Sequence, residues 1–522
     1  MSGHVKGATA VFFVLVLAIV GFYFGEPVWQ NWRQQKTSDA GATRGKISVA
    51  VDNWVGYFPL CSPRMKTHLR RAGWLLDCVD DKADYASRMK GLKDGKYNFA
   101  VATIDSYILN AAPLGFPGVI GAVIDESKGG DGIVAWEDKV ANLNDIKGKI
   151  GLRVVYTPNS PSHHLLKVGK DHFGIPEILP SGKEKIESDG SEAALKVLLE
   201  KKADIAVLWE PDVSRALAQK GVVKLLGTED TKRLIVDVLL INRQFSSASP
   251  EVAKFFISTY FRVLKEYRDN PDELLKDVVN QTKLSESAVK SMLNGVSWVN
   301  LTENAQEWFG VSVDGTPSAD GLISAIESTV SILVGNKDFS SNPLPAGDPY
   351  RITQSQYIQE LFGKGVSGFT VAGVRGQKGE VADSIAAKFQ PLSAPAWANL
   401  REIGSLRIAP IVFPTGVSDL GYEAKLELDK VAEKLKHYPN FRVLVKGHTG
   451  LSGDKDENRK LSQERAESVA RYFEVTYGVD SNRVLAVGKG SDEPLPKAPG
   501  ESSRAHNYRL PRVEIRLVSE VY

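Results

Sequence analysis

Residues 446–466 read KGHTGLSGDKDENRKLSQERA. The run Phe441–Val445 before them is short and β-rich, and the segment from Leu461 to Tyr477 carries apolar residues at helical spacing. A strand therefore leads into a polar loop, and the loop leads into a helix. Because free backbone N–H groups at a helix start favour anionic or carboxylate-bearing ligands, we expect a binding loop here.

The pattern GHTG, Asn458, Leu461-Ser462 and Arg465-Ala466 resembles the OmpA-like peptidoglycan-binding domain, whose motif reads GHTD, N, LS and RA at the same intervals. The resemblance implies an OmpA-like α+β domain (βαβαβ) over residues 404–522. In that family, the Asp of GHTD and the Arg of RA hold the diaminopimelate end of the wall peptide. The resemblance implies these peptidoglycan-binding residues: Thr449, Gly450, Asn458, Leu461, Arg465 and Arg512.

One position departs from the family pattern, because Gly450 stands where the family has Asp. The lost carboxylate would pair with the ammonium of the peptide, a charge-assisted hydrogen bond worth roughly 1.5–3 kcal/mol. Asp454 or Asp456 could replace it if the loop folds back. The resemblance favours wall binding, weakened by this change, over a docking module that keeps only the fold.

Length and composition indicate an ordinary folded protein of two or three domains. The chain has 522 residues, of which 43% are hydrophobic and 25% charged. Lys and Arg number 65 against 63 Asp and Glu, so the balance predicts no nucleic acid partner.

The N-terminus predicts a membrane anchor. Residues 7–25 contain no charged side chain, which corresponds to about 28 Å of helix, close to the ~30 Å core of a bilayer. Trp29 and Trp32 follow at interface level. We expect a cytoplasmic N-terminus (1–7), a single-pass transmembrane anchor (8–25) and a tether (26–45). A cleaved signal peptide is the alternative, but the apolar core ends in Phe-Tyr-Phe-Gly-Glu-Pro rather than in small residues.

Strand and helix signals alternate from Lys46 onward, which predicts an α/β domain whose ligand binds at the carboxyl ends of parallel strands. The strand-end segments resemble the type II periplasmic substrate-binding proteins of the nitrate, sulfonate, taurine and thiamine-pyrimidine group of ABC transporters. They are residues 51–59, 103–105, 129–135, 148–151 with 156–166, and 203–211. We expect a bilobed domain at 46–340, with lobe 2 at about 137–235, and a junction at 341–403. Both resemblances place the bulk of the chain in the periplasm, anchored to a bacterial inner membrane.

The second resemblance implies a cleft between two lobes that binds a small polar or anionic solute. The residues it implies are Trp54, Tyr57, Thr103, Asp105, Gly130, Gly132, Ser160, Ser162, Trp209 and Glu210. Ser160 or Ser162 could instead only cap a helix, and Trp54 and Tyr57 could be core aromatics. We expect the chain to cross between the lobes near residues 132–136 and 236–242.

Cys61 and Cys78 are the two cysteines of the chain. In an oxidising compartment they could form a disulfide, because a helix start and a late strand position lie at the same edge of a parallel α/β layer. Two buried thiols are the alternative.

No motif for catalysis, a cofactor or a metal site is recognised, so we predict a protein that is not an enzyme. The order of anchor, binder and wall-binding module favours a sensor or an envelope scaffold. A wall-anchoring subunit of a stator-like motor, with a multi-span membrane partner, is the second hypothesis. Glu26 lies at the end of the span rather than within it, which disfavours direct ion coupling. A third possibility is a scaffold that has lost its ligand.

Overall fold

The computed structural model describes residues 43–229, 231–311, 320–363, 388–411, 413 and 416–520. The predicted anchor lies outside these residues, as does nearly all of the predicted tether. Within the described ranges, no helix combines the length and the apolar character that a bilayer crossing requires.

Lobe 1 is built on a six-stranded sheet in the order β11-β4-β10-β3-β1-β2. β1 pairs in parallel with β2 and β3, whereas β10 runs antiparallel to β3 and β4. The strands are β1 (Gly45–Val51), β2 (Trp74–Asp80), β3 (Phe99–Thr103), β4 (Gly118–Ser127), β10 (Val236–Asn242) and β11 (Val296–Trp298).

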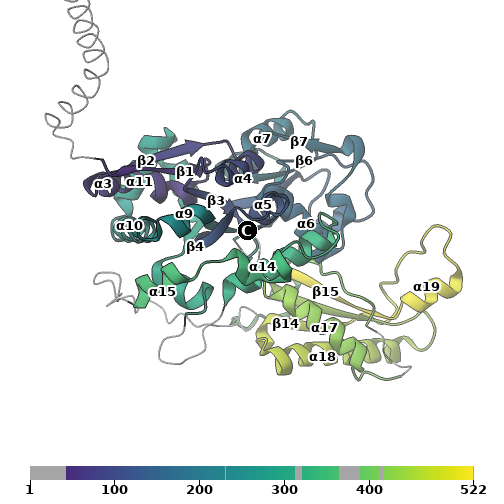
Figure 1. Cartoon of the computed structure of the whole chain (residues 1–522). Helices are drawn as coiled ribbons and strands as arrows, with labels where there is room; N and C mark the ends of the chain where they lie inside the picture. The colour runs from purple at the N-terminus through teal and green to yellow at the C-terminus, as the bar shows by residue number, and fades with distance from the viewer. Residues whose placement is uncertain are drawn as a thin grey trace, which may run out of the picture.

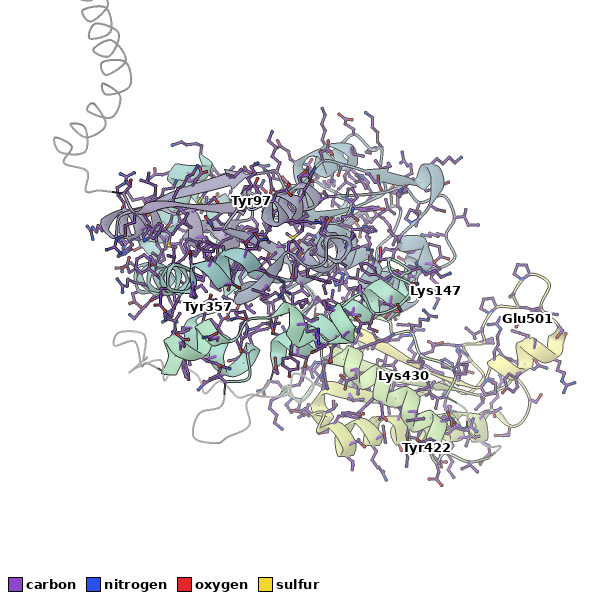
Figure 2. All side chains as sticks on the ribbon, in the orientation of Figure 1. Tyr97, Lys147, Tyr357, Tyr422, Lys430 and Glu501 are labelled. Atoms are coloured by element: carbon purple, nitrogen blue, oxygen red, sulfur yellow. A yellow bond between two sulfur atoms is a disulfide. The ribbon has the colours of Figure 1, made fainter. Side chains whose placement is uncertain are left out.

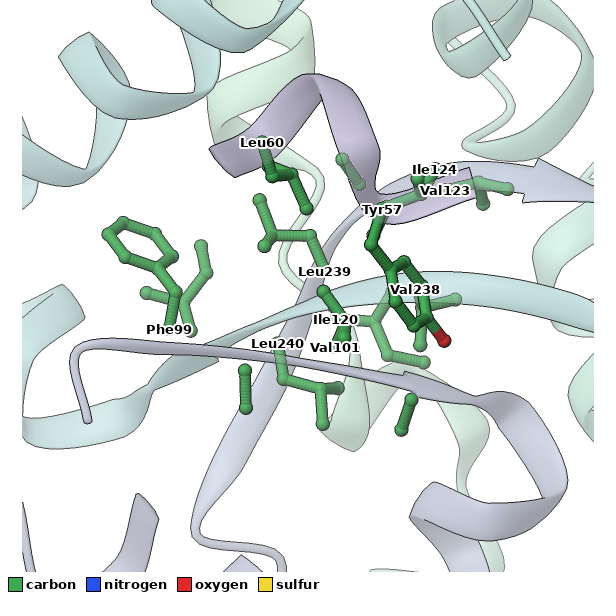
Figure 3. Close-up of a cluster of buried hydrophobic side chains, with 14 of the residues drawn as sticks. Tyr57, Leu60, Phe99, Val101, Ile120, Val123, Ile124, Val238, Leu239 and Leu240 are labelled. Atoms are coloured by element: carbon green, nitrogen blue, oxygen red, sulfur yellow. The ribbon is translucent and has the colours of Figure 1, made fainter. Parts of the chain in front are cut away.

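The central strands β3, β4 and β10 are buried along their whole length, as expected for a sheet covered by helices on both faces. Figure 3 shows the aliphatic side chains of these strands, with Tyr57 beside Val238. The helices of this lobe are α2 (Phe58–Cys61), α3 (Pro63–Arg71), α4 (Tyr85–Lys93), α5 (Ile104–Ala111), α9 (Arg243–Ala248), α10 (Pro250–Asp269), α11 (Pro271–Thr282), α12 (Glu286–Asn294) and α13 (Leu301–Glu303).

Lobe 2 is built on a five-stranded sheet in the order β7-β6-β8-β5-β9. Its strands are β5 (Asp131–Trp136), β6 (Val154–Tyr156), β7 (Lys185–Glu187), β8 (Ile205–Trp209) and β9 (Val222–Gly227). Its helices are α6 (Pro161–Phe173), α7 (Ser191–Leu199) and α8 (Asp212–Leu217).

The chain crosses between the lobes at 128–130, between β4 and β5, and again at 228–235, between β9 and β10. Both predicted crossings were placed too late, because residues 132–136 and 236–242 are strands of the sheets themselves. The two crossing segments are held together by hydrogen bonds of the Thr228 hydroxyl with Ser127 Oγ and with the backbone N–H of Asp131.

Cys61 and Cys78 form a disulfide that links the end of α2 to β2. Cys61 closes the short helix α2, whereas the sequence reading placed it at a helix start. The next helix, α3, begins at Pro63 and is capped by Ser62, whose hydroxyl accepts a hydrogen bond from the backbone N–H of Met65.

The segment after lobe 1 returns to it before the chain reaches the C-terminal domain. Helix α14 (Gly321–Gly335) contacts α5 of lobe 1 and α6 of lobe 2. Helix α15 (Gln356–Gly363) packs on lobe 1, where the hydroxyl groups of Tyr357 and Ser246 are hydrogen-bonded. The two-lobed domain therefore includes residues to 363, part of the segment predicted as a junction.

The C-terminal domain has a four-stranded sheet in the order β12-β15-β13-β14. Its strands are β12 (Arg401–Ser405), β13 (Arg442–His448), β14 (Val484–Gly488) and β15 (Arg512–Ser519), and its helices are α16 (Ala394–Ala398), α17 (Tyr422–Leu435), α18 (Lys455–Tyr477) and α19 (Ser503–Arg509). In Figure 1 this domain lies beside lobe 2, with α14 along the boundary.

Candidate functional site

A small cavity, partly open to solvent, lies where the two lobes meet. The centre of a water molecule can occupy about 20 Å³ of it, which is room for one or two waters or one small polar group. The lining residues are Asp52, Trp54, Tyr57, Ala83, Tyr85, Thr103, Asp131, Pro161, Trp209, Ile235 and Asp237. The lobes are therefore closed on a small, aromatic and acidic space.

Trp54 closes one side of the cavity. It follows β1, and its backbone N–H donates to Asp52 Oδ1 at 3.0 Å, while its indole Nε1–H donates to Asp125 Oδ1 at 3.2 Å. A Cβ built on Gly130 would come within 2.2 Å of the Trp54 ring, so glycine at this crossing lets the indole pack directly against the backbone. Gly130 thus allows close approach of the Trp54 ring to the backbone. Gly132 lies within β5, opposite Leu208 and Gly227.

The carboxylates of the cavity come from three different strand ends. Asp52 follows β1, Asp131 begins β5, and Asp237 lies in β10. Asp131 accepts a hydrogen bond from Ser127 Oγ at 2.7 Å, and Asp237 accepts one from the Tyr57 hydroxyl. The donors to these two carboxylates are neutral hydroxyl groups.

Burial shifts the titration of these groups. Burial raises the pKa of Asp131 to about 7, and the neighbouring carboxylates of Asp105 and Glu210 add to the rise. Burial also raises the pKa of Asp237 well above its usual value, with Asp125 as the next cause, and it raises the pKa of Asp125 to about 8. The cavity is thus a place where negative charge is costly unless a positive charge joins it.

Asp52 is the exception, because a cation already compensates it. Arg88 is fully buried and donates to Asp52 Oδ2 at 3.0 Å, to Asp81 and to the carbonyl oxygen of Val101.

Lobe 2 supplies the opposite wall. Trp209 and Pro161 line the cavity, whereas Ser160, Ser162 and Glu210 do not. Ser160 occupies the N-cap position of α6, but its hydroxyl donates to the carbonyl oxygen of Thr157 at 2.6 Å and caps no backbone N–H. Ser162 Oγ is buried and has no hydrogen-bond partner among the described residues. Ser160 therefore occupies the predicted N-cap position, but its side chain does not cap the helix.

Two further predicted residues lie near the cavity but differ in role. Asp105 is buried in the first turn of α5 and accepts from Ser106 Oγ at 3.3 Å, and Thr103, which lines the cavity, donates to that same Ser106 hydroxyl. Glu210 accepts from the backbone N–H and the hydroxyl of Ser214. Glu210 therefore mainly holds the start of α8.

The sequence reading missed Asp52, Tyr85, Asp131 and Asp237 as lining residues. A signal was present for Asp237 and for Asp125 behind the cavity, because each stands within a long apolar strand, where an unpaired carboxylate is costly. No group of three or more His, Cys, Asp or Glu among the described residues could hold a metal ion.

The second site lies in the C-terminal domain, where β13 ends and α18 begins. A Cβ built on Gly447 would come within 2.1 Å of the Ser462 carbonyl oxygen, so glycine lets α18 pack directly against the strand. The backbone N–H of Thr449 donates to the Gly490 carbonyl oxygen, and the Gly490 N–H donates to Ser462 Oγ. The loop is thereby pinned on both sides.

The predicted wall-binding residues are distributed around this loop. Asn458 Nδ2 donates to the Ser452 carbonyl oxygen at 3.0 Å, and Arg512 lies opposite His448 in the sheet. Leu461 stands one turn before Arg465 on α18, and the Arg465 guanidinium packs 5.0 Å over the Phe413 ring. Arg465 Nε also donates to the Val417 carbonyl oxygen at 3.1 Å.

Gly450 faces open space, since a Cβ built on it would meet no atom within 4 Å. Asp454 does not replace the missing carboxylate, because it caps α18 by accepting from the backbone N–H groups of Asp456 and Glu457. His448, just before the loop, is buried, and burial lowers its pKa to about 4.

Comparison with known proteins identifies the family of the C-terminal domain. Residues 412–508 match the model of the OmpA family. The C-terminal domain is an OmpA domain.

Outer membrane protein Omp38 of Acinetobacter baumannii is 36% identical to the chain over 100 residues, which are 19% of this chain and 28% of that protein. Peptidoglycan-binding protein ArfA of Mycobacterium tuberculosis is 34% identical over 121 residues, which are 23% of this chain and 36% of that protein. The chain thus spans about a third of the length of these relatives, within the region of the OmpA domain.

Among solved structures, the periplasmic aliphatic sulphonate binding protein SsuA from Escherichia coli covers 57% of this chain and 89% of its own, with 14% identity and a TM-score of 0.44.

The OmpA domain is docked on the two-lobed domain. Apolar residues of lobe 2 and of the OmpA domain form one continuous cluster that includes Leu143, Phe173, Ile403, Tyr438 and Leu435. The Tyr438 hydroxyl and His172 Nδ1 of α6 are 2.8 Å apart. Figure 2 shows the side chains on both sides of this boundary, with Lys147 on lobe 2 and Lys430 on α17.

The OmpA domain also contacts the second crossing segment. The Lys232 backbone N–H donates to the His437 carbonyl oxygen at 2.8 Å, and His437 Nδ1 lies 2.9 Å from the Lys232 carbonyl oxygen. Because a carbonyl can only accept, Nδ1 carries the proton, and Nε2 accepts from Ser328 Oγ of α14 at 3.0 Å. One imidazole thus joins the hinge, α14 and the OmpA domain.

Proposed function

We propose that this protein is an envelope sensor that binds a small solute between its two lobes and reports occupancy to an OmpA domain attached to peptidoglycan. The observation that carries the proposal is the junction at His437, which ties the OmpA domain to the hinge segment 228–235 and to α14. Opening of the lobes must change the path of this segment. The OmpA domain therefore responds to the state of the cleft.

Wall attachment is supported by Arg465, which keeps its place in the OmpA motif and lies in the middle of α18, the helix that packs against the pinned loop. The name of the relative ArfA describes a peptidoglycan-binding protein of the same domain type. The missing carboxylate at Gly450 weakens binding of an ammonium group, but the open space there does not obstruct a wall peptide.

We further propose that residues 8–25 anchor the chain in the inner membrane, with the two-lobed and OmpA domains in the periplasm. A binder held by a membrane at one end and by the wall at the other cannot diffuse to a transporter. This arrangement suits sensing, or positioning of an envelope complex, better than bulk uptake.

Sedimentation with purified peptidoglycan tests wall attachment. We expect the protein to pellet with peptidoglycan, the variant Arg465→Ala to lose this retention, and Gly450→Asp to increase it. Arg471→Ala is the matched control, because Arg471 lies on the exposed face of the same helix. Equal retention of Arg465→Ala and Arg471→Ala would contradict wall binding through this site.

Hydrogen exchange tests the sensing role. Closing the cleft with a bound solute is expected to change amide protection in residues 228–235 and at the end of α17. His437→Ala should leave solute binding in place and remove the change in α17. A change in α17 that persists in His437→Ala would refute the role of this junction.

A further inference from the structure

The charge of the cleft indicates which class of solute enters it, an inference that rests on the proposed solute-binding function. Three of the residues that line the cavity are carboxylates, and no Lys, Arg or His lines it in the described part of the chain. An anion placed here would face Asp131 and Asp237 with no cation beside it. A sulfonate or nitrate is therefore a poor occupant.

The two carboxylates that lack a cation lie on different lobes. Asp131 begins β5 of lobe 2, and Asp237 lies in β10 of lobe 1. Arg88 pairs with Asp52. Asp131 accepts a hydrogen bond from Ser127 Oγ and Asp237 accepts one from the Tyr57 hydroxyl, and neither has a positive partner among the described residues of the cavity. Closing the lobes brings these acidic groups together, so the ionised carboxylates need a positive charge between them to stabilise the closed form.

An unpartnered oxygen behind the cavity supports the same reading. Asp125 is fully buried, and its Oδ2 accepts no hydrogen bond from any described group. It lies behind Trp54, which donates to its other oxygen, and close enough to Asp237 to raise the pKa of that residue. A buried carboxylate oxygen without a donor is costly, and a cation in the cavity would offset part of this cost.

Aromatic side chains form the remaining walls. Trp54, Tyr57, Tyr85 and Trp209 all line the cavity. Aromatic faces attract organic cations, and they pack against the carbon atoms that carry an ammonium group. We propose that the cleft binds a small organic cation, whose primary ammonium group lies between Asp131 of lobe 2 and Asp237 of lobe 1.

A primary ammonium group fits better than a bare metal ion. It offers three N–H donors to separated acceptors, whereas the described carboxylates are not grouped closely enough to hold a metal ion. The space open to a water-sized group is about 20 Å³, which matches one ammonium group in the closed form. A carbon chain attached to it would lie against the aromatic walls.

Isothermal titration calorimetry of the whole protein tests the proposal, with ethylammonium, 1,4-diaminobutane, ethanesulfonate and calcium chloride as separate probes. We expect one of the two amines to bind and ethanesulfonate and calcium to show no binding. Asp131→Asn and Asp237→Asn should each weaken amine binding by roughly tenfold to a hundredfold, the range for one charge-assisted hydrogen bond. Asp429→Asn in the OmpA domain is the control and should leave the affinity unchanged.

The outcomes separate this inference from the function on which it rests. Binding of ethanesulfonate, strengthened by Asp237→Asn, would overturn the cationic class while solute binding by the cleft still holds. Calcium binding that depends on Asp131 and Asp237, without amine binding, would also overturn it. Absence of binding by every probe, together with unchanged hydrogen exchange in residues 228–235, would overturn both.

Discussion

Replacing Asp131 by Asn should stabilise the empty protein at alkaline pH, although the residue lines the proposed binding cavity. The pKa of Asp131 is raised to about 7 by burial, against roughly 3.9 in an unfolded chain. Between these values, the folded protein keeps a proton that the unfolded chain has lost. The free energy of unfolding therefore falls as the pH rises through this window.

The size of the effect follows from the separation of the two pKa values. About three pH units at 1.36 kcal/mol each correspond to about 4 kcal/mol at pH 8. The groups that face the Asp131 carboxyl do not cancel this cost, because they are the carboxyl groups of Asp105, Glu210, Asp125 and Asp237 and the hydroxyl group of Ser127. The amide oxygen introduced by Asp131→Asn could still accept the hydrogen bond from Ser127.

Thermal unfolding without ligand, recorded at pH 5 and at pH 8, measures the effect. At 2–4 °C per kcal/mol, the Asp131→Asn variant should gain on the order of 10 °C over the unaltered protein at pH 8 and roughly a third of that at pH 5. Asp429→Asn is the control, because hydrogen bonds from Tyr472 and Tyr477 lower the pKa of Asp429, the opposite direction. Identical pH profiles for Asp131→Asn and the unaltered protein would refute the reasoning.

Three further outcomes follow from the same structure. Amine binding should tighten as the pH rises from 6 to 8 and should release protons, because the cation favours the ionised forms of Asp131, Asp125 and Asp237. Calorimetry in buffers of different ionisation enthalpy measures this proton release. The titratable groups that face these three carboxyl groups are Asp52, Asp105, Glu210 and Tyr57. Cys61→Ser with Cys78→Ser should lower the free energy of unfolding by about 3 kcal/mol, since the disulfide joins residues 17 positions apart, and a denaturation curve unaffected by the double change would contradict this value. Tyr438→Phe leaves His172 Nδ1 buried without its partner and should lower the free energy of unfolding by about 1–3 kcal/mol. The loss should appear as faster proteolysis between lobe 2 and the OmpA domain, whereas Tyr422→Phe, at an exposed position, should have no effect.

Much of the architecture could be predicted from sequence because local patterns determine it. The loop that begins at Thr449 and the helix after it follow from a β-rich run, a polar segment and helical spacing. The lobes follow from alternating strand and helix signals. Trp54, Tyr57, Thr103 and Trp209 were predicted from the resemblance to substrate-binding proteins, and the structure places all four on the cavity wall.

The rest depends on contacts between distant segments. The positions of the crossings could not be predicted from sequence, because an apolar run such as residues 132–136 or 236–242 is compatible both with a strand of a sheet and with a segment that connects the lobes. The role of Ser160 depends on whether its hydroxyl meets the Thr157 carbonyl oxygen or a backbone N–H. Docking of the OmpA domain through His437 could not be predicted from sequence, because neither the segment around His437 nor the segment around Lys232 shows a periodic pattern.

The acidic cleft and the docked OmpA domain together explain how occupancy could be converted into a signal. In an empty closed form, Asp131 on lobe 2 and Asp237 on lobe 1 are held near each other in a buried space that raises the pKa of both carboxyl groups, so closure requires that they keep their protons, at a cost that grows as the pH rises. A cation between them takes the place of those protons and stabilises the ionised carboxylates, so at neutral and alkaline pH an occupied site favours closure. Because residues 228–235 form one of the two connections between the lobes and carry the contact from Lys232 to His437, closure changes the position of the element to which the OmpA domain is bound. The same carboxylates that make the empty protein less stable at neutral pH therefore make its conformation depend on the ligand.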